Sequence, residues 1–456
     1  MNIASPLKER DTASVLHPQT NPARHMDSGP LVISKGSGVY VTDDNDNEYI
    51  DGASSLWCAS LGYSSERLAK VAYDQMARLG SYNTFRHMSN ESSIALSEKL
   101  ISIAPVSMSK VLLQCSGSEA NDTAIKLVWY YFSALGKPEK RKIIGREKGY
   151  HGSSCAAISV SGKPDMHQGF GLPLDGFLHT KCPHYWRERL EGETEEAFST
   201  RMADELEKLI LAEGPETVAA FFAEPIMGAG GAVFPPKTYF EKIQAVLKKY
   251  DILFVVDEVI CGFGRTGNMW GSQTFGLKPD MVSCAKALSA GMIPISALLI
   301  NDKIFQAILA QGGSFGNFAH GYTYAGHPVA AAVALETLKI YEEDKVFENV
   351  RSRGEQLSAR LEGFANYEFV GSVDSVGLIA GIEIFDRGEG RGNTRIAKDI
   401  ASRLDKKIRE SGLILRVIGN RITLAPPLII GSEDLEELLR RLDAAFQAVS
   451  SDLRLA

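Results

Sequence analysis

The chain contains the stretch Ile252-Leu253-Phe254-Val255-Val256-Asp257-Glu258, in which five apolar residues directly precede two acids. A short, continuous apolar run of this kind indicates a strand that is buried on both faces, as in a parallel sheet covered by helices. Two carboxyl groups at the end of such a strand are costly to bury without partners. The stretch therefore predicts a polar site at the carboxyl end of a central strand.

Similar apolar runs lie on both sides of this stretch and alternate with helical patterns from about residue 64 to residue 330. The predicted strands are 110–114, 142–146, 219–223, 252–256, 281–285 and 295–300, and the predicted helices include 118–134, 196–212 and 236–250. Such alternation is typical of crossover units in a mainly parallel sheet. We predict an α/β fold with this region as its large domain.

The flanking regions have a different pattern. Residues 38–42 and 48–51 are predicted to form a hairpin after an N-terminal arm or short helix. Two long helical patterns (329–343 and 347–364) lead into the apolar stretch 376–385, a helix at 395–411, a hairpin of 413–418 and 421–424, and a last helix at 433–448. Gly419-Asn420 suits the tight turn of that hairpin. We predict a small α+β domain made of residues 1–63 and 331–456, packed on a large domain of residues 64–330.

Composition excludes several classes of function. The 456 residues carry a net charge of -7, which argues against a general nucleic-acid binder, because such proteins neutralise phosphates. None of the six cysteines forms a C-x-x-C pair, so we expect free thiols, and we predict no metal site. The first 20 residues lack a signal-peptide core, and no stretch is long and apolar enough to cross a bilayer. We expect a cytoplasmic protein without membrane or nucleic-acid partners.

Other predicted strands also end in residues that suit chemistry. Ser116-Gly117-Ser118 lies between a strand and a helix, where small residues and free N–H groups can bind an anion, although a plain serine cap explains the same residues. Lys286 follows the apolar run 281–285, and burial there would lower the pKa of its amine and make it nucleophilic. Tyr150, in Tyr150-His151-Gly152, could stack on a flat ring. In an open α/β sheet such strand ends lie at one edge.

The stretch Gly262-Phe263-Gly264-Arg265-Thr266-Gly267 matches the glycine pattern of dinucleotide-binding proteins. Asp257 and Glu258 stand just upstream and would repel a pyrophosphate, and the residues that follow do not open a helix. We therefore do not predict a nucleotide site, and a nucleotide-dependent oxidoreductase is a disfavoured alternative.

Taken together, these motifs resemble the class III aminotransferases. The resemblance rests on the stretch from Phe254 to Gly267 followed by Lys286, and on Gly117-Ser118-Glu119-Ala120-Asn121, Tyr150-His151-Gly152 and Gly321-Tyr322-Thr323-Tyr324-Ala325-Gly326-His327-Pro328. The motifs keep the family's order over nearly the whole chain. The resemblance implies the type I pyridoxal-phosphate fold, pyridoxal 5'-phosphate as cofactor, and a homodimer with a shared active site, with a tetramer as the alternative.

The family pattern also assigns roles to residues. Lys286 would hold the cofactor as an aldimine and carry a proton, and Asp257 would pair with the pyridine nitrogen. The other residues implied to bind the cofactor are Ser116, Gly117, Ser118, Tyr150, His151, Glu224, Val259, Tyr322 and Thr323, with Thr323 contributed by the partner chain. The residues implied to line the substrate pocket are Gln19, Leu56, Trp57, Phe85, Tyr150 and Arg416. Arg416 would bind the substrate carboxylate through a two-pronged bond.

Within the family, the chain is most similar to amine–pyruvate (omega) aminotransferases. This implies transfer of an amino group from a primary amine to pyruvate or a similar 2-oxo acid. An omega-amino acid or diamine aminotransferase that uses 2-oxoglutarate is an alternative, as is an aminomutase or decarboxylase on the same fold. Gln19 stands where many relatives carry an aromatic residue, which predicts a more polar pocket.

Overall fold

The predicted large sheet is present in the computed structural model, which describes residues 6–392 and 394–455. Seven strands lie in the order β4-β10-β9-β8-β7-β5-β6. β10 is antiparallel to both of its neighbours, and the other pairs are parallel. The strands are β4 (Lys110–Gln114), β5 (Lys142–Arg146), β6 (Phe177–Thr180), β7 (Val218–Ala223), β8 (Leu253–Asp257), β9 (Met281–Cys284) and β10 (Ser296–Ile300).

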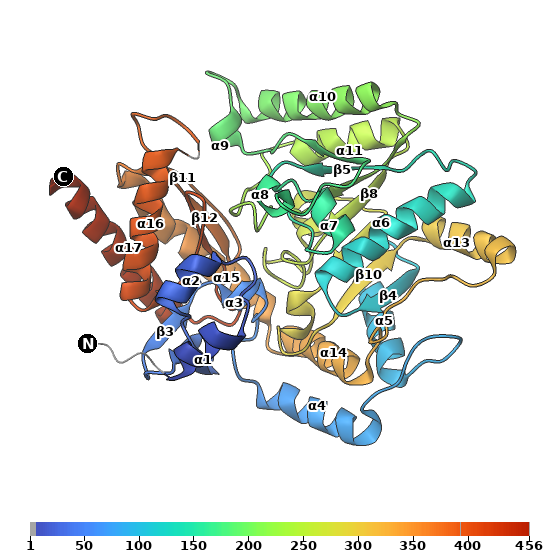
Figure 1. Ribbon diagram of the computed structural model, residues 1–456, viewed down its shortest axis with the longest axis horizontal. Helices are drawn as coiled ribbons and strands as arrows, with labels where there is room; N and C mark the ends of the chain where they lie inside the picture. Colours follow the sequence, from blue (N-terminus) through green and yellow to red (C-terminus); the bar gives the residue numbers. More distant parts are fainter. Residues whose placement is uncertain (1–5, 393, 456) are drawn as a thin grey trace.

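Helices cover both faces of this sheet (Figure 1). Leu253 and Val255 of β8 belong to the core formed with α6 (Gly117–Ala134). The alternate residues Phe254 and Val256 belong to the core formed with α10 (Glu195–Glu213) and α11 (Tyr239–Lys249). Successive side chains of a strand point to opposite faces, so a strand between two helical layers is apolar throughout. The prediction of a doubly covered, mainly parallel sheet is confirmed.

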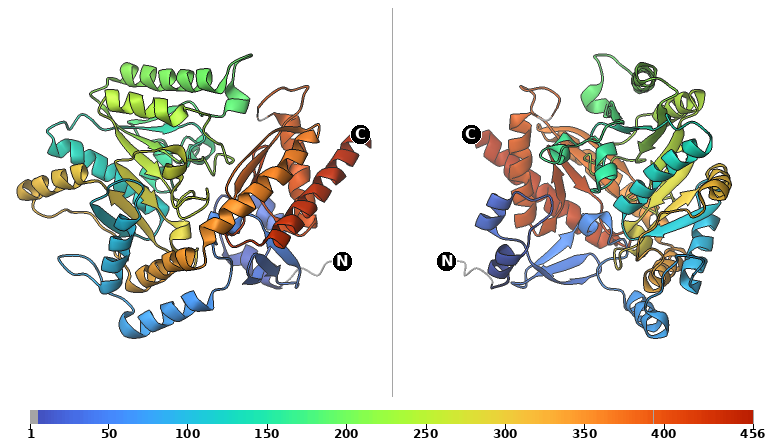
Figure 2. Two further views of the ribbon diagram at one scale, coloured as in Figure 1. Left: turned by 180° about the vertical axis from the view of Figure 1, so that it is seen from behind. Right: turned by 45° about the vertical axis from the view of Figure 1, so that its right-hand side comes forward.

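The N-terminal and C-terminal regions of the chain lie side by side, as both views in Figure 2 show. Strands β1 (Ile33–Ser37), β2 (Tyr40–Asp43) and β3 (Glu48–Asp51) form a sheet with β13 (Leu413–Ile414), which pairs with β3 in parallel. A third sheet contains β11 (Val370–Val376), β12 (Ile379–Ile384), β15 (Arg421–Leu424) and β14 (Arg416–Ile418). The N-terminal hairpin is thus anchored by residues far along the chain.

The predicted strand 413–418 is wrong in one respect. Its first residues form β13 in the N-terminal sheet, and only Arg416–Ile418 pairs with β15 in the hairpin. A single strand 413–418 would place Ile414, Arg416 and Ile418 on one face, but Ile414 and Arg416 lie on different strands, so this shared face does not exist. The chain changes sheets at Leu415, which is buried against Gly52 and the last helix.

The remaining helices complete the two flanks. They are α1 (Pro6–Ser14), α2 (Pro22–Ser28), α3 (Ser54–Trp57), α4 (Glu66–Leu79), α5 (Glu91–Ser102), α7 (Cys155–Val160), α8 (Pro164–His167), α9 (Tyr185–Glu188), α12 (Gly271–Phe275), α13 (Asp302–Phe315), α14 (Pro328–Glu343), α15 (Val346–Leu361), α16 (Arg395–Glu410) and α17 (Ser432–Leu455), with 3-10 turns at Lys286–Ser289 and Glu362–Asn366. No helix in the described part of the chain has both the length and the hydrophobicity needed to cross a membrane.

A buried polar network joins the C-terminal sheet to the segment that carries α9. Arg421 Nη1 donates to Glu383 Oε2 at 3.0 Å and to His184 Nε2 at 2.9 Å. Arg187 Nη2 lies 2.7 Å from Glu383 Oε1. Arg421 also donates to the backbone oxygen of Ala232 at 3.0 Å. Because Arg421 and Glu383 are almost fully buried, loss of either partner would leave an uncompensated charge in the interior.

The glycine-rich stretch 262–267 packs against the C-terminal part of the chain. Arg265 is buried and donates through Nη1 to the backbone oxygens of Leu378 and Pro426. A Cβ on Gly264 would meet the Phe347 ring at 2.4 Å. The glycines therefore allow close packing between parts of the chain.

Candidate active site

A cavity of about 310 Å³ lies at the carboxyl edge of the large sheet. Its lining brings together most of the residues predicted to bind the cofactor, namely Ser116, Gly117, Ser118, Tyr150, His151, Glu224, Asp257, Val259 and Lys286. They follow the ends of β4, β5, β7, β8 and β9. The alternation of strand and helix thus delivers side chains that are far apart in sequence to one place, as expected for this type of sheet.

Asp257 is the most firmly held of these side chains. Its Oδ2 accepts hydrogen bonds from Asn121 Nδ2 and His151 Nδ1, both at 2.8 Å, and its Oδ1 accepts from the Val259 N–H at 3.0 Å. These three hydrogen bonds fix the orientation of the carboxylate. Asp257 thus has partners of its own other than Lys286.

Lys286 lies two residues beyond the end of β9 and lines the cavity. Within the described chain, its amine makes no hydrogen bond or ion pair. Burial lowers the pKa of this amine, while the nearby Asp257 carboxylate acts in the opposite direction. The backbone of Lys286 has a φ of 49°, a conformation that costs a non-glycine residue about 1–3 kcal/mol and that occurs often at functional sites. A free amine whose pKa is lowered by burial is what a covalent anchor for an aldehyde requires.

The start of α6 forms another wall of the cavity. Ser116 caps the helix by accepting from the Glu119 N–H at 3.2 Å, and Ser118 Oγ accepts from the Ser153 N–H at 3.0 Å. A Cβ on Gly117 would meet both methyl groups of Val259 at 3.0–3.1 Å, so only glycine fits here without displacing that side chain. The remaining N–H groups of the first turn have no partners inside the helix and can bind an anion.

Glu224 braces two loops at the base of the cavity. Its carboxylate accepts from the N–H groups of Tyr150, at 3.0 Å, and of Gly228, at 2.9 Å. Burial raises the pKa of this carboxyl group. The Tyr150 hydroxyl is in turn within 3.0 Å of Ser153 Oγ. Glu224 therefore fixes the loop that carries the predicted ring-stacking residue.

The predicted substrate residues Trp57 and Arg416 lie together. The guanidinium of Arg416 lies 4.8 Å from the centre of the Trp57 ring. Burial lowers the pKa of Arg416, opposed by the nearby Tyr150. Trp57 is only 3% exposed and packs in one cluster with Ile260, a residue that lines the cavity. Leu56, by contrast, is 58% exposed.

Leu56, Trp57 and Arg416 do not line the cavity itself, and four further predicted residues also lie outside its lining. Gln19 and Thr323 are exposed, and neither lines the cavity. Phe85, which is 43% exposed, and Tyr322 line a separate groove of about 580 Å³ between α5 and the loop before α14.

Sequence reasoning also missed residues that the fold places at the cavity. Asn121 lies in one of the quoted motifs, but no role was assigned to it, although its position one turn into α6 directs it to Asp257. Cys58, Ser289 and Ile293 line the cavity as well. No pattern in their neighbourhood indicates this.

The chemistry of the lining fits pyridoxal phosphate. The cavity offers free N–H groups for a phosphate at α6, a held carboxylate at Asp257 for a ring N–H⁺, and the Lys286 amine for an aldehyde. These three groups match the phosphate, the ring nitrogen and the aldehyde of that cofactor. Fold and site together define a fold type I enzyme of the pyridoxal-phosphate class.

The chain belongs to the class III aminotransferase family, whose model matches residues 22–446. Class III aminotransferases depend on pyridoxal phosphate, and the protein is an aminotransferase.

Curated and solved relatives agree with this assignment. Gamma-aminobutyrate transaminase 1 of Oryza sativa subsp. indica is 46% identical over 435 residues, which cover 95% of this chain and 84% of that protein. The vanillin aminotransferase of Capsicum frutescens is 47% identical over 91% of this chain and 90% of that protein. The structure of the omega transaminase from Pseudomonas jessenii in complex with PMP is similar with a TM-score of 0.96 and 48% identity, covering 98% of this chain and 99% of that chain.

Proposed function

We propose that this aminotransferase binds pyridoxal phosphate through Lys286 and moves an amino group from a primary amine to pyruvate or a similar small 2-oxo acid. The observation that carries the proposal is the free Lys286 amine in the same cavity as the firmly held Asp257 carboxylate. When bound, the cofactor supplies an electron-accepting ring.

Two side chains would carry out most of the protein's role in the reaction. Asp257, held by Asn121 and His151, would keep a proton on the ring nitrogen by charge pairing. The Lys286 amine, with its pKa lowered by burial, would accept the proton that leaves the substrate carbon and return it at the end of the transfer. The Ser116–Ser118 segment would fix the phosphate, so that the ring stays aligned with both groups.

Arg416 would bind the carboxylate of the 2-oxo acid. It is half-buried, and no carboxylate within the described residues pairs with it. A guanidinium in such surroundings gains most from a ligand that carries its own negative charge. Arg416 contacts the Trp57 ring, and the family resemblance implies that it swings away when an uncharged amine side chain enters.

The second candidate is an omega-amino acid aminotransferase that uses 2-oxoglutarate. The similarity to a gamma-aminobutyrate transaminase, at 46% identity, fits this alternative without favouring it. The two candidates differ in the amino and oxo acids that exchange with the enzyme, so they can be separated by testing L-alanine and L-glutamate in parallel.

The test uses protein purified with pyridoxal phosphate. With L-alanine, we expect the visible absorbance of the bound cofactor to fall while one pyruvate forms per site. Lys286→Ala should abolish both signals, and Lys278→Ala, which changes an exposed lysine outside the cavity, should leave them intact. Response to L-glutamate but not to L-alanine would move the assignment to the second candidate. Protein that takes up no cofactor would overturn the proposal.

We further propose a homodimer that completes this site. Large apolar side chains are exposed from α4 to α5, namely Tyr73, Met76, Leu79, Tyr82, Phe85, Met88 and Ile94. A surface of this kind is typical of an interface. In a dimer it would be covered, and Phe85, Tyr322 and Thr323 could reach the partner's cavity. Sedimentation of the native protein as a monomer at micromolar concentration would contradict this proposal.

A further inference from the structure

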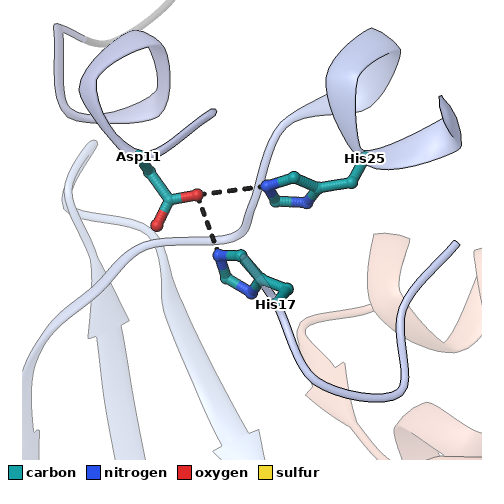
Figure 3. A group of neighbouring side chains, drawn as sticks. All are labelled: Asp11, His17 and His25. Carbon is teal, nitrogen blue, oxygen red and sulfur yellow. Dashed lines mark hydrogen bonds and ion pairs between the residues drawn. The ribbon is translucent and has the colours of Figure 1, made fainter. Parts of the chain in front are cut away.

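Two histidine side chains of the N-terminal arm converge on a single carboxylate oxygen of Asp11 (Figure 3). Asp11 lies in α1, His25 lies in α2, and His17 lies in the segment between these helices. Asp11 Oδ1 is 2.8 Å from His17 Nε2 and 3.1 Å from His25 Nε2. The side chains are 21%, 30% and 10% exposed for Asp11, His17 and His25, so the cluster is largely shielded from solvent.

The arm lacks another obvious source of stability. Neither α1, with nine residues, nor α2, with seven, contains a buried residue. Helices this short are marginal on their own in water. Small structural units that cannot bury a core are commonly held by a disulfide or a metal ion. The cluster is the place where α1, the intervening segment and α2 meet.

The geometry suits a metal ion. The three ligand atoms, two imidazole nitrogens and one carboxylate oxygen, all lie within 4.8 Å of one another. Ligands bound to Zn²⁺ at about 2.0–2.1 Å stand about 3.3 Å apart in a tetrahedral site. The present separations of 2.8 and 3.1 Å from the Asp11 oxygen need to widen by only a few tenths of an ångström. Both rings direct the same atom, Nε2, toward the shared point.

Space for further ligands is also present. A cavity of about 300 Å³ adjoins the cluster, lined by both histidines and by Thr12, Thr20 and Met26, among others. A water molecule or an external ligand could enter there and complete the coordination of a metal held by three protein groups.

We propose that Asp11, His17 and His25 form a binding site for a divalent transition-metal ion such as Zn²⁺, which fastens α1 to α2. Two imidazoles and one carboxylate are a ligand set that such ions prefer. On binding, each histidine presents an unprotonated Nε2 and keeps its proton on Nδ1. The bound ion would fix the turn that contains Gln19, two residues after His17. The site is independent of Lys286 and of the cofactor.

The experiment measures Zn²⁺ uptake by the full, cofactor-loaded protein after treatment with a chelator and desalting. Competition with a chromophoric chelator should show one Zn²⁺ per chain. The variants Asp11→Asn and His25→Gln should each weaken this affinity at least about tenfold. Asp27→Asn, an exposed acid of α2, and His87→Gln, an exposed histidine, are the matched controls and should bind as the parent does.

Hydrogen exchange provides a second, local readout. Addition of Zn²⁺ should slow exchange of the backbone amides in residues 6–29 of the parent and of both controls, but not in the two cluster variants. Uptake that is equal in parent and cluster variants would overturn the proposal, because the ion would then bind elsewhere. Exchange in the arm that does not respond to Zn²⁺ would equally overturn it, because the ion would not fasten the helices.

Discussion

At the scale of single residues, two neighbouring acids at the end of β8 have opposite environments. Asp257 accepts from two polar side chains and faces the cavity. Glu258 faces the interior, where its carboxylate accepts from the N–H groups of Gly271 and Ser272. Burial, only partly offset by these hydrogen bonds, raises the pKa of Glu258 to about 7. Of the two acids, only Asp257 is placed to pair with a ligand in the cavity.

We therefore predict that Asp257→Asn lowers the turnover of amino transfer by about 10²-fold or more, which corresponds to about 2.7 kcal/mol. The amide cannot balance a charge on the ring nitrogen, although the cofactor should still bind. Glu258→Gln is the matched control, since the neutral form of this side chain is already accessible near pH 7. Steady-state kinetics with L-alanine check the prediction, and equal losses in both variants would contradict it.

A second prediction concerns Arg416. Replacement by leucine should lower kcat/KM for pyruvate about 10- to 100-fold. This range corresponds to the loss of a charge-assisted hydrogen bond, which contributes about 1.5–3 kcal/mol. The loss should appear mainly in KM, while conversion of an amine without a carboxylate should change little. Arg403→Leu, at an exposed position of α16, is the control. Unchanged KM for pyruvate in Arg416→Leu would remove Arg416 from the pocket.

At the scale of elements, the fully buried strands were predictable from the sequence. The predicted strands 110–114 and 142–146 match β4 and β5 in both bounds, and the other four predicted strands of this sheet differ by a residue at one end or both. Continuous apolar runs between polar loops give this accuracy because both faces are buried. β6 (Phe177–Thr180) was not predicted, because it is a short edge strand with His179 and Thr180 among its four residues.

The candidate site was predictable only in part. Residues that follow strand ends, such as Lys286 and Glu224, converge because the topology of a parallel sheet requires it. Asn121 reaches the site through helical geometry, and Cys58 reaches it through an irregular loop, so the sequence does not reveal either contact. The cluster of Asp11, His17 and His25 was missed, and no metal site was predicted, because the spacing matches no familiar metal motif. The domain boundaries and the cytoplasmic location stay predictions.

The N-terminal arm carries a prediction of its own. Gln19 lies in the exposed turn between α1 and α2, and the family resemblance places it near the substrate pocket. Gln19→Phe should raise the preference for aromatic over polar amines about tenfold, because burial of an aromatic ring contributes about 1.5–3 kcal/mol. Ratios of kcat/KM for paired amines measure this. Full activity towards polar amines with no gain on aromatic ones would contradict it.

At the scale of the whole molecule, the network around Glu383 should make the contact between the C-terminal sheet and the segment that carries α9 sensitive to acid. Burial, helped by Arg421 and opposed by Glu383, lowers the pKa of His184 from 6.5 to about 4. Burial raises the pKa of Glu383, but the hydrogen bond with His184 and the charges of Arg421 and Arg187 bring it from 4.5 down to about 2. The pKa values of both groups are lower in the folded protein than in the unfolded chain, so in acid the unfolded chain binds more protons.

The contribution of these two groups to the free energy of unfolding should thus be fully present above about pH 6.5. It is lost as the pH falls from 6.5 towards 4 for His184 and from 4.5 towards 2 for Glu383, with a slope of at most about 1.4 kcal/mol per pH unit for each proton. Thermal unfolding at a series of pH values measures this. His184→Gln should flatten the decline between pH 6.5 and 5, and an unchanged pH profile in that variant would contradict the assignment.

The parallel pairing of β13 with β3 also has a consequence for synthesis of the protein. Ile50 and Asp51 emerge from the ribosome early, but Leu413 and Ile414, which pair with them, emerge 363 residues later (413 − 50). At about 5–20 residues per second, the edge of β3 waits about 20–70 s for its partner. Asp51 also accepts hydrogen bonds from the backbone N–H groups of Ala53 and Ser55, which lie next to Trp57 in the sequence. The part of the site near Trp57 can therefore reach its final structure only when translation is nearly finished. A nascent chain that stalls before residue 413 would carry a complete large sheet and an open strand edge, which is a natural binding site for a chaperone.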